Sequence, residues 1–312
     1  MVVPIVNPCK EDDRPDWEAL ERNAQRLLTP QIQGLYINGG TGDAASLTRQ
    51  ERLDIAAYMV KAAKSAGKLA IVHVGQTTLR EAVLLAEQAM TLGADAVASI
   101  PPRKGWPQVA AYYRTLAATG APTFVYDIPG MTGMTPGMPE LRTLLEIPGV
   151  VGLKLSDWNV FLACCIRREF PDTIIYSGFD EMLVPGLLYG ADGCIGTWIN
   201  LLPKTYAAIY RRVCAGRINE ILPLMRRFTT FLAVCNVRPP LNTFESLMLA
   251  KGYAARCFRK PSAWDPNEID SRTTDLLCRT VDELEADAGR LMENEERPAA
   301  QSQRQEGAAA TF

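Results

Sequence analysis

Histidine is nearly absent from this chain, since His73 is the single histidine among 312 residues. This scarcity argues against Ser-His catalytic triads, HExxH zinc sites and histidine-rich metal sites. We therefore expect no metal ligands in the functional site, and we interpret His73 as a structural residue rather than a base. Proton transfer in any reaction must then depend on other side chains.

Three further features are missing. The net charge is -2, from 33 basic and 35 acidic residues, and no basic cluster has interleaved aromatics, so we expect no nucleic-acid partner. No apolar run reaches membrane-spanning length, and Met1–Val6 lacks the basic start of a signal peptide. The eight cysteines include no CxxC pair, which predicts structural thiols in a cytoplasmic protein.

What the chain does contain is a regular alternation of strand-like and helix-like segments. Eight strand-like segments within about 215 residues predict an α/β fold, a (β/α)8 barrel. A doubly wound sheet is the alternative, but the G-x-G-x-x-G that usually follows its first strand is missing. The predicted strands are Val2–Val6, Gly34–Asn38, Leu69–Val74, Ala96–Ile100, Thr123–Asp127, Val150–Lys154, Thr173–Ser177 and Gly193–Gly196.

The strand signal stops near residue 216. An apolar stripe at helical spacing runs from Ile218 to Leu232, and helix-like segments follow at Leu241–Ala250 and Ser271–Met292. These patterns predict a barrel over residues 1–215 and a C-terminal helical domain over residues 216–293. The polar end of the chain, residues 294–312, is predicted to be a disordered tail.

Two neighbouring predicted strands end in residues that can do chemistry. Tyr126 lies near the end of one strand, and Lys154 closes the buried-looking run Gly149–Lys154. If the strands are parallel neighbours, the phenol and the amine meet at the mouth of the barrel, where such barrels hold their active sites. An amine in a partly dry pocket can form a Schiff base with a ketone, and a phenol can move protons. The alternatives are a solvated lysine or one paired with Asp157, and a core tyrosine.

Two other strand ends offer binding groups. The loop Gly39–Asp43 lets backbone N–H groups approach a carboxylate closely, although a tight turn has the same composition. Asp180 and Glu181 follow the seventh predicted strand and could accept hydrogen bonds from a polyhydroxylated substrate. The alternative is that they favour the dipole of a following helix.

Together these motifs resemble the pyruvate-dependent class I aldolases of the N-acetylneuraminate lyase and dihydrodipicolinate synthase family. The resemblance runs from about Pro4 to Pro261. The motifs that carry it are Gly34–Asp43, Tyr126–Pro129, Gly152–Lys154, Gly190–Gly196 and the late Gly252 with Arg259–Pro261. It implies a (β/α)8 barrel with a C-terminal helical domain in a homotetramer, with Lys154 as the Schiff-base lysine and Tyr126 as the proton relay.

The N-acetylneuraminate lyase branch is the more similar one. Its His-Val-Gly motif matches 73–75, and its Gly-x-Asp-Glu motif, which binds sugar hydroxyls, matches 178–181. Two positions depart from that branch, since Gly40 replaces a serine and Asp43 replaces a glutamate. The synthase branch fits less well, because Gly40 and Met131 replace its second threonine and its arginine. Trp158 and Trp198 would also make the mouth more apolar than a sugar site requires.

The resemblance implies a lyase that cleaves a 2-oxo acid, such as N-acetylneuraminate or a related sugar acid, to pyruvate and an aldehyde. No cofactor is expected, because the Schiff base on Lys154 accepts the electrons. The alternatives are an aldolase or dehydratase for another 2-oxo acid, deoxy-sugar or aromatic, and a pyruvate-binding protein without catalysis. The expected substrate-binding residues are Gly40, Thr41, Ser156, Gly178, Asp180, Glu181 and Thr197.

Overall fold

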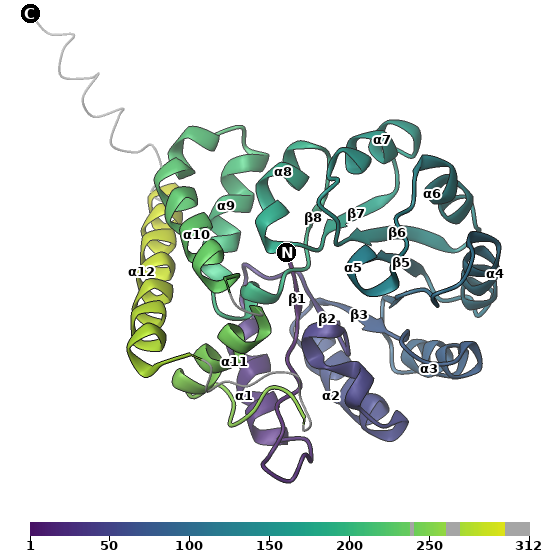
Figure 1. Ribbon diagram of the computed structural model, residues 1–312, viewed down its shortest axis with the longest axis horizontal. Helices are drawn as coiled ribbons and strands as arrows, with labels where there is room; N and C mark the ends of the chain where they lie inside the picture. The colour runs from purple at the N-terminus through teal and green to yellow at the C-terminus, as the bar shows by residue number, and fades with distance from the viewer. Residues whose placement is uncertain (238–239, 260–268, 297–312) are drawn as a thin grey trace, which may run out of the picture.

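A computed structural model describes residues 1–237, 240–259 and 269–296. Eight strands form one sheet in which each strand pairs in parallel with the next along the chain. Figure 1 shows the strands arranged around a centre with helices outside them, which confirms the predicted barrel. The strands are β1 Val2–Pro4, β2 Gly34–Ile37, β3 Leu69–His73, β4 Ala96–Ser99, β5 Thr123–Asp127, β6 Val150–Leu155, β7 Ile174–Ser177 and β8 Gly193–Cys194.

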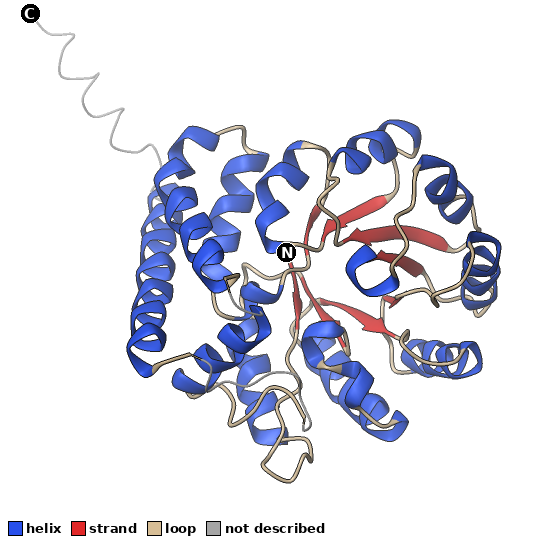
Figure 2. Ribbon diagram, in the orientation of Figure 1, coloured by secondary structure: helices blue, strands red, loops and turns tan. Residues whose placement is uncertain are grey.

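The helices that follow the strands form an outer layer (Figure 2). Polar side chains cap the beginnings of the first three. The Thr48 hydroxyl accepts from the backbone N–H of Glu51, and the Glu51 carboxylate accepts from the backbone N–H of Thr48. Thr78 caps the next helix in the same way as Thr48, by accepting from the backbone N–H of Glu81. These helices are α1 Trp17–Leu27, α2 Arg49–Ser65, α3 Leu79–Thr91, α4 Trp106–Ala117, α6 Met138–Leu145, α7 Phe161–Glu169, α8 Leu183–Leu188 and α9 Pro203–Cys214. The short helix α5 Pro129–Thr132 lies inside this ring, over the strands in the view of Figure 1.

Several strands are shorter than predicted at their carboxyl ends. β1 stops at Pro4 and β8 at Cys194, although the backbone N–H groups of Ile5 and Ile195 still donate to Tyr36 and Ser177 of the neighbouring strands. The β8 side returns to β1 through the 3-10 turn Thr197–Asn200. There the amide of Asn200 donates to the carbonyl of Pro4 at 2.8 Å, so a side chain links the two sides of the barrel.

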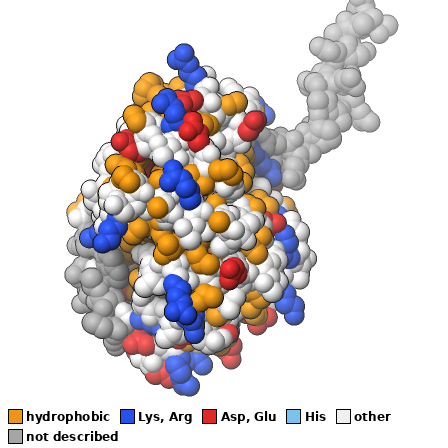
Figure 3. All heavy atoms as spheres, turned by 90° about the vertical axis from the view of Figure 1, so that its right-hand side faces the viewer, with side chains coloured by type: hydrophobic (Ala, Val, Ile, Leu, Met, Phe, Trp, Pro, Cys, Tyr) orange, Lys and Arg blue, Asp and Glu red, His pale blue; other side chains and the backbone are white. Residues whose placement is uncertain are grey.

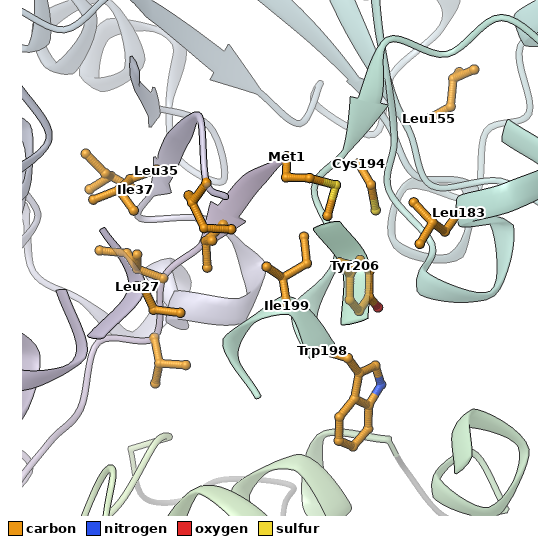
Figure 4. Packing of buried hydrophobic residues seen from close by; sticks show 14 of the residues in the cluster. Met1, Leu27, Leu35, Ile37, Leu155, Leu183, Cys194, Trp198, Ile199 and Tyr206 are labelled. Carbon is orange, nitrogen blue, oxygen red and sulfur yellow. The ribbon is translucent and has the colours of Figure 1, made fainter. Parts of the chain in front are cut away.

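The core has two parts because strand side chains alternate between the two faces of the sheet. One part lies between the sheet and the helices, and Figure 4 shows a portion of it around Met1, Leu35 and Tyr206. The other part fills the barrel interior and includes Tyr36, Phe124, Tyr126 and Tyr176. Tyr126 therefore faces inward, whereas Val125 beside it packs in the outer cluster.

Helical structure continues after the barrel as predicted, with the 3-10 turn η5 Ile218–Ile221 and helices α10 Leu222–Cys235, α11 Pro240–Ala250 and α12 Ser271–Glu296. The predicted stripe is split between η5 and α10, because Pro223 occupies the first turn of α10, where proline is favoured. The division into domains at residue 216 stays a prediction. Of the predicted tail, residues 294–296 are helical, and the rest lies outside the described residues.

The helix α12 is attached to the barrel helix α9. Glu285 accepts hydrogen bonds from the backbone N–H and the hydroxyl of Thr205, at 2.8 and 2.9 Å. Arg212 donates to the carbonyl of Leu291 at 2.9 Å. In this way the C-terminal helices are held against the barrel beside its last strand, and α10 and α11 can contribute residues to its mouth.

The surface shows mixed charge. On the face in Figure 3, basic and acidic side chains are interspersed with hydrophobic ones, without a block of one sign. Across the described segments, no helix combines the length and the hydropathy needed to cross a bilayer. All eight cysteines are free thiols.

Candidate active site

The central pair of the site is Tyr126 and Lys154, which are register partners on the adjacent parallel strands β5 and β6. The Lys154 Nζ lies 4.3 Å from the centre of the Tyr126 ring and 5.0 Å from that of Tyr36. The prediction that an amine and a phenol meet at the mouth is confirmed. Aromatic faces at such distances attract a cationic amine.

Lys154 is neither solvated nor ion-paired with Asp157. It is 5% exposed, and among the described residues it takes part in no salt bridge. Asp157 instead accepts from the backbone N–H of Asn159 at 3.0 Å. A buried lysine amine at the wall of a cavity is positioned to act as a nucleophile.

Ser156 and Gly178 shape the space around the lysine. The Ser156 hydroxyl lies 3.5 Å from the Tyr126 hydroxyl, within reach for a weak hydrogen bond. A Cβ at Gly178 would lie 2.0 Å from Ser156 Oγ and 2.9 Å from Lys154 Cε. Gly178 therefore leaves space for the side chains of Ser156 and Lys154, and its predicted contact with the substrate stays a prediction.

The glycine loop forms a short 3-10 turn, η1, over Gly40–Gly42. The N–H groups that begin such a turn have no partner within it, which leaves those of Gly40 and Thr41 for another acceptor. The hydroxyls of Thr41 and Thr197 form a hydrogen bond of 2.8 Å with each other. A side chain at Gly40 would meet nothing within 4 Å, so this position opens onto free space. The loop combines N–H groups, a hydroxyl and room, as a carboxylate site requires.

Asp180 has several partners within the protein. Its carboxylate accepts from the backbone N–H of Thr197 at 3.1 Å, from that of Trp198 at 3.3 Å, and from the Tyr206 hydroxyl. Burial raises the pKa of Asp180 to about 7, although the Tyr206 hydrogen bond opposes that rise. Asp180 thus fixes the Thr197 turn. Its predicted contact with substrate hydroxyls stays a prediction.

Glu181 accepts a hydrogen bond from the side-chain amide of Asn236, the residue that follows α10. Asp180 and Glu181 open the 3-10 turn Asp180–Met182, which runs directly into α8, so the alternative that they favour a helix dipole stays open. Glu181 lines the cavity, and its predicted contact with substrate hydroxyls stays a prediction.

His73 lies in the barrel interior and is fully buried. Its Nε2 accepts from the backbone N–H of Ile100 at 3.3 Å. Burial lowers the pKa of His73 well below its usual range, and the charges of Arg52 and Lys154 add to that effect. The imidazole is therefore neutral at ordinary pH, which agrees with a structural role.

A cavity of about 700 Å³ joins these groups. Its inner part consists of four buried residues, namely Thr41, Tyr126, Lys154 and Ser156, each at most 8% exposed. Its outer part includes Trp158, Phe179, Glu181 and Asn236, of which Trp158 is 62% exposed. All nine predicted site residues lie on its wall, including Gly40, Gly178, Asp180 and Thr197.

Sequence reasoning missed part of the wall. Asn236, Leu241 and Phe258 come from the C-terminal segments, and Gln76 follows β3. Only Gln76, just after a strand end, could have been found from its position in the barrel. Trp198 was expected at the mouth and does line the cavity, but it is only 3% exposed because it packs against Phe231 and Phe244.

Asp127 is a second buried carboxyl next to the site, on the opposite side of β5 from Tyr126. It is 6% exposed, and its Oδ2 has no hydrogen-bond partner. Burial raises the pKa of Asp127 to about 7, and the nearby Asp157 carboxylate adds to the rise. Asp127 is therefore largely protonated in mildly acidic solution.

Comparison with known proteins identifies relatives of this arrangement. The family model described as "Dihydrodipicolinate synthetase family" matches residues 1–277. An N-acetylneuraminate lyase of Rhizobium meliloti (strain 1021) is 34% identical over 266 residues, covering 82% of this chain and 88% of the relative. An N-acetylneuraminate lyase of Enterobacter sp. (strain 638) is 34% identical over 218 residues, covering 68% and 73%.

Solved structures agree on the fold. The N-acetylneuraminate lyase of Fusobacterium nucleatum superposes with a TM-score of 0.81 at 24% identity, covering 91% of this chain and 97% of that one. The 4-hydroxy-tetrahydrodipicolinate synthase of Methylacidiphilum fumariolicum SolV gives a TM-score of 0.83 at 21% identity, covering 93% and 98%. The chain belongs to the dihydrodipicolinate synthetase family and is a carbon–carbon lyase of the class I aldolase type.

Proposed function

We propose that this enzyme cleaves a 2-oxo acid to pyruvate and an aldehyde through a Schiff base on Lys154. N-acetylneuraminate or a related sugar acid is the substrate we expect. The observation that carries the proposal is the buried Lys154 amine, which lies 4.3 Å from the centre of the Tyr126 ring and lines the cavity together with Tyr126. The names of the curated relatives support the same chemistry.

In the proposed first step, the substrate carboxylate binds the free N–H groups of the Gly40–Thr41 turn and the Thr41 hydroxyl. This leaves the C2 carbonyl next to Lys154. The amine attacks C2 and forms a carbinolamine. The C2 oxygen then leaves as water, carrying two protons that came from the lysine ammonium group, and an iminium ion remains. The hydroxyl of Ser156 and the hydroxyl pair of Thr41 and Thr197 can pass these protons from nitrogen to oxygen.

Bond cleavage follows from the electron demand of the iminium. Tyr126 removes the proton of the C4 hydroxyl, the C3–C4 bond breaks, and its electron pair moves to the iminium to form an enamine. The aldehyde leaves with C4. The enamine then takes a proton at C3, and hydrolysis releases pyruvate and the free lysine. These steps use only the side chains of the protein, so the proposal requires no metal or organic cofactor.

The test is a cleavage assay with N-acetylneuraminate, in which the pyruvate released is measured by its reduction with lactate dehydrogenase. We expect turnover by the natural chain and a loss of at least about a thousandfold in Lys154→Ala, because the nucleophile is removed. Turnover that persists in Lys154→Ala would rule out the Schiff-base mechanism. A Schiff base without cleavage of any sugar acid would favour another 2-oxo acid.

We also propose a homotetramer in the cytoplasm. Phe161 and Leu188 are 59% and 62% exposed, and Phe161 contacts the ring of Tyr189, which gives α7 and α8 an exposed apolar surface. Such a surface suits a contact with a second copy. The eight free thiols fit a reducing compartment. Analytical ultracentrifugation should give four chains per particle and smaller particles for Phe161→Glu, whereas a monomeric natural protein would contradict the assignment.

A further inference from the structure

The late motif that begins at Arg259 takes no part in the proposed chemistry. Arg259 closes the segment Arg256–Arg259, which we call the strap and which contributes Phe258 to the wall of the cavity. Glu245 of α11 holds the strap, because its carboxylate accepts from the backbone N–H groups of Cys257 and Phe258 at 2.7 and 3.2 Å. The strap is therefore anchored to the C-terminal helices at the mouth of the barrel.

The Arg259 side chain reaches from the strap to the beginning of α2. Its two terminal nitrogens donate to the two carboxylate oxygens of Glu51, at 2.9 and 2.7 Å. The guanidinium also donates to the backbone carbonyl of Ser46 at 3.1 Å, and the Arg259 backbone N–H makes a longer contact of 3.4 Å with the Asp43 carboxylate. Arg259 lowers the pKa of Glu51 to about 2, so the pair stays charged at every ordinary pH. These bonds join the strap to the chain that directly follows the glycine turn.

The glycine turn η1 needs such support, since its own bonds are few. The backbone N–H groups of Gly42 and Asp43 donate to carbonyls at the start of the turn, at 3.1 and 3.0 Å. Glycine allows many backbone conformations, so these bonds alone do not fix the turn. Asp43 adopts a left-handed backbone with φ of 50°, which is uncommon for a residue other than glycine. Its carboxylate accepts the hydroxyl of Ser46 at 2.6 Å, so the same group of contacts holds this conformation.

We propose that Arg259 is a positioning residue for the carboxylate half of the substrate. By bonding Glu51 and Ser46, it holds the glycine turn in the shape that presents its free N–H groups to the carboxylate. This inference rests on the proposed function and makes one part of it more specific. Lys154 and Tyr126 are held by the strand register instead, so the reaction itself should not depend on Arg259.

The experiment measures borohydride trapping at Lys154 in the full chain as a function of pyruvate concentration. Arg259→Leu should raise the half-saturating pyruvate concentration by about tenfold, which corresponds to roughly one lost hydrogen bond. The yield of adduct at saturation should stay the same. Methyl pyruvate has no carboxylate, so its half-saturating concentration should change little. Arg259→Lys keeps the cation without the planar fork, and it should recover part of the loss.

Two further variants separate positioning from a general loss of structure. Glu51→Gln removes the charge that Arg259 meets but keeps a side chain that can cap α2. It should also raise the half-saturating pyruvate concentration, and combining it with Arg259→Leu should add little, because both changes break the same contact. Arg142→Leu is the matched control. Arg142 also bonds both carboxylate oxygens of a glutamate, Glu169, and neither residue lines the cavity within the described ranges, so both ketones should behave as in the natural chain.

The two ketones and the natural chain give distinct ways to fail. An unchanged half-saturating pyruvate concentration in both Arg259→Leu and Glu51→Gln would overturn the inference. An equal rise for pyruvate and methyl pyruvate would also overturn it, because it would mark a general disturbance of the site. In both cases the adduct on the natural chain would leave the proposed function standing. A natural chain that forms no adduct at any pyruvate concentration would remove the proposed function, and this inference with it.

Discussion

The inner and outer parts of the cavity are built in different ways. Tyr126 and Lys154 come from two adjacent strands and are brought together by the register of those strands, and Ser156 directly follows the second strand. Trp158, Phe179 and Asn236 come from loops and from the end of α10, and they meet only through tertiary packing. The inner part is buried and suits one reaction, whereas the outer part is more open and can vary with the substrate. Substitutions in the outer part should therefore be able to change which substrate binds without changing the reaction at Lys154.

Tyr126→Phe should give the larger effect on the inner part. The change removes only the hydroxyl that we assign to proton transfer, so kcat for cleavage should fall by about 10²- to 10⁴-fold. The ring remains beside Lys154, and pyruvate should still form a trappable adduct. Steady-state kinetics and borohydride trapping on the same preparation check both statements. A variant with normal kcat would show that another group moves the proton.

Gly178→Ala tests whether the inner part tolerates displacement. The added Cβ would lie 2.0 Å from Ser156 Oγ, so Ser156 and Lys154 must move. A displacement of this size should lower kcat by about 10²-fold. Gly130→Ala is the matched control, because a Cβ there meets nothing within 4 Å. Similar kinetics for the two variants would mean that the inner geometry is not critical.

Asp127→Asn tests the buried carboxyl behind the inner part. The folded-state pKa is raised from 3.8 to about 7, so this group opposes folding increasingly as pH rises from about 4 to 7. The variant keeps the shape without the charge. The free energy of unfolding of Asp127→Asn should exceed that of the natural chain by an amount that grows between pH 4 and pH 7 to roughly 2 to 4 kcal/mol.

Denaturant unfolding at several pH values measures this difference. Asp275→Asn, at an exposed position on α12, is the control and should show no comparable trend. A constant difference between Asp127→Asn and the natural chain from pH 4 to pH 8 would contradict the raised pKa.

The same contrast explains what the sequence could predict. The register of β5 and β6 follows from short strands with local signals, and it was enough to predict that Tyr126 meets Lys154. The partners of Asp180 could not be predicted, because Tyr206 lies on α9 and the Thr197 turn follows β8. Neither could the contribution of Asn236, since no local pattern shows where the end of α10 lies relative to the barrel. Short-range pairing is visible in the sequence, whereas contacts between distant elements are not.

Trapping the Schiff base tests the central claim most directly. The natural chain would be mixed with pyruvate and borohydride, its intact mass measured, and the modified peptide identified after digestion. We predict one reduced pyruvyl group on Lys154 and none on Lys154→Ala treated in the same way. No adduct, under conditions that label a known class I aldolase, or an adduct on a different lysine, would contradict the assignment of Lys154 as the nucleophile.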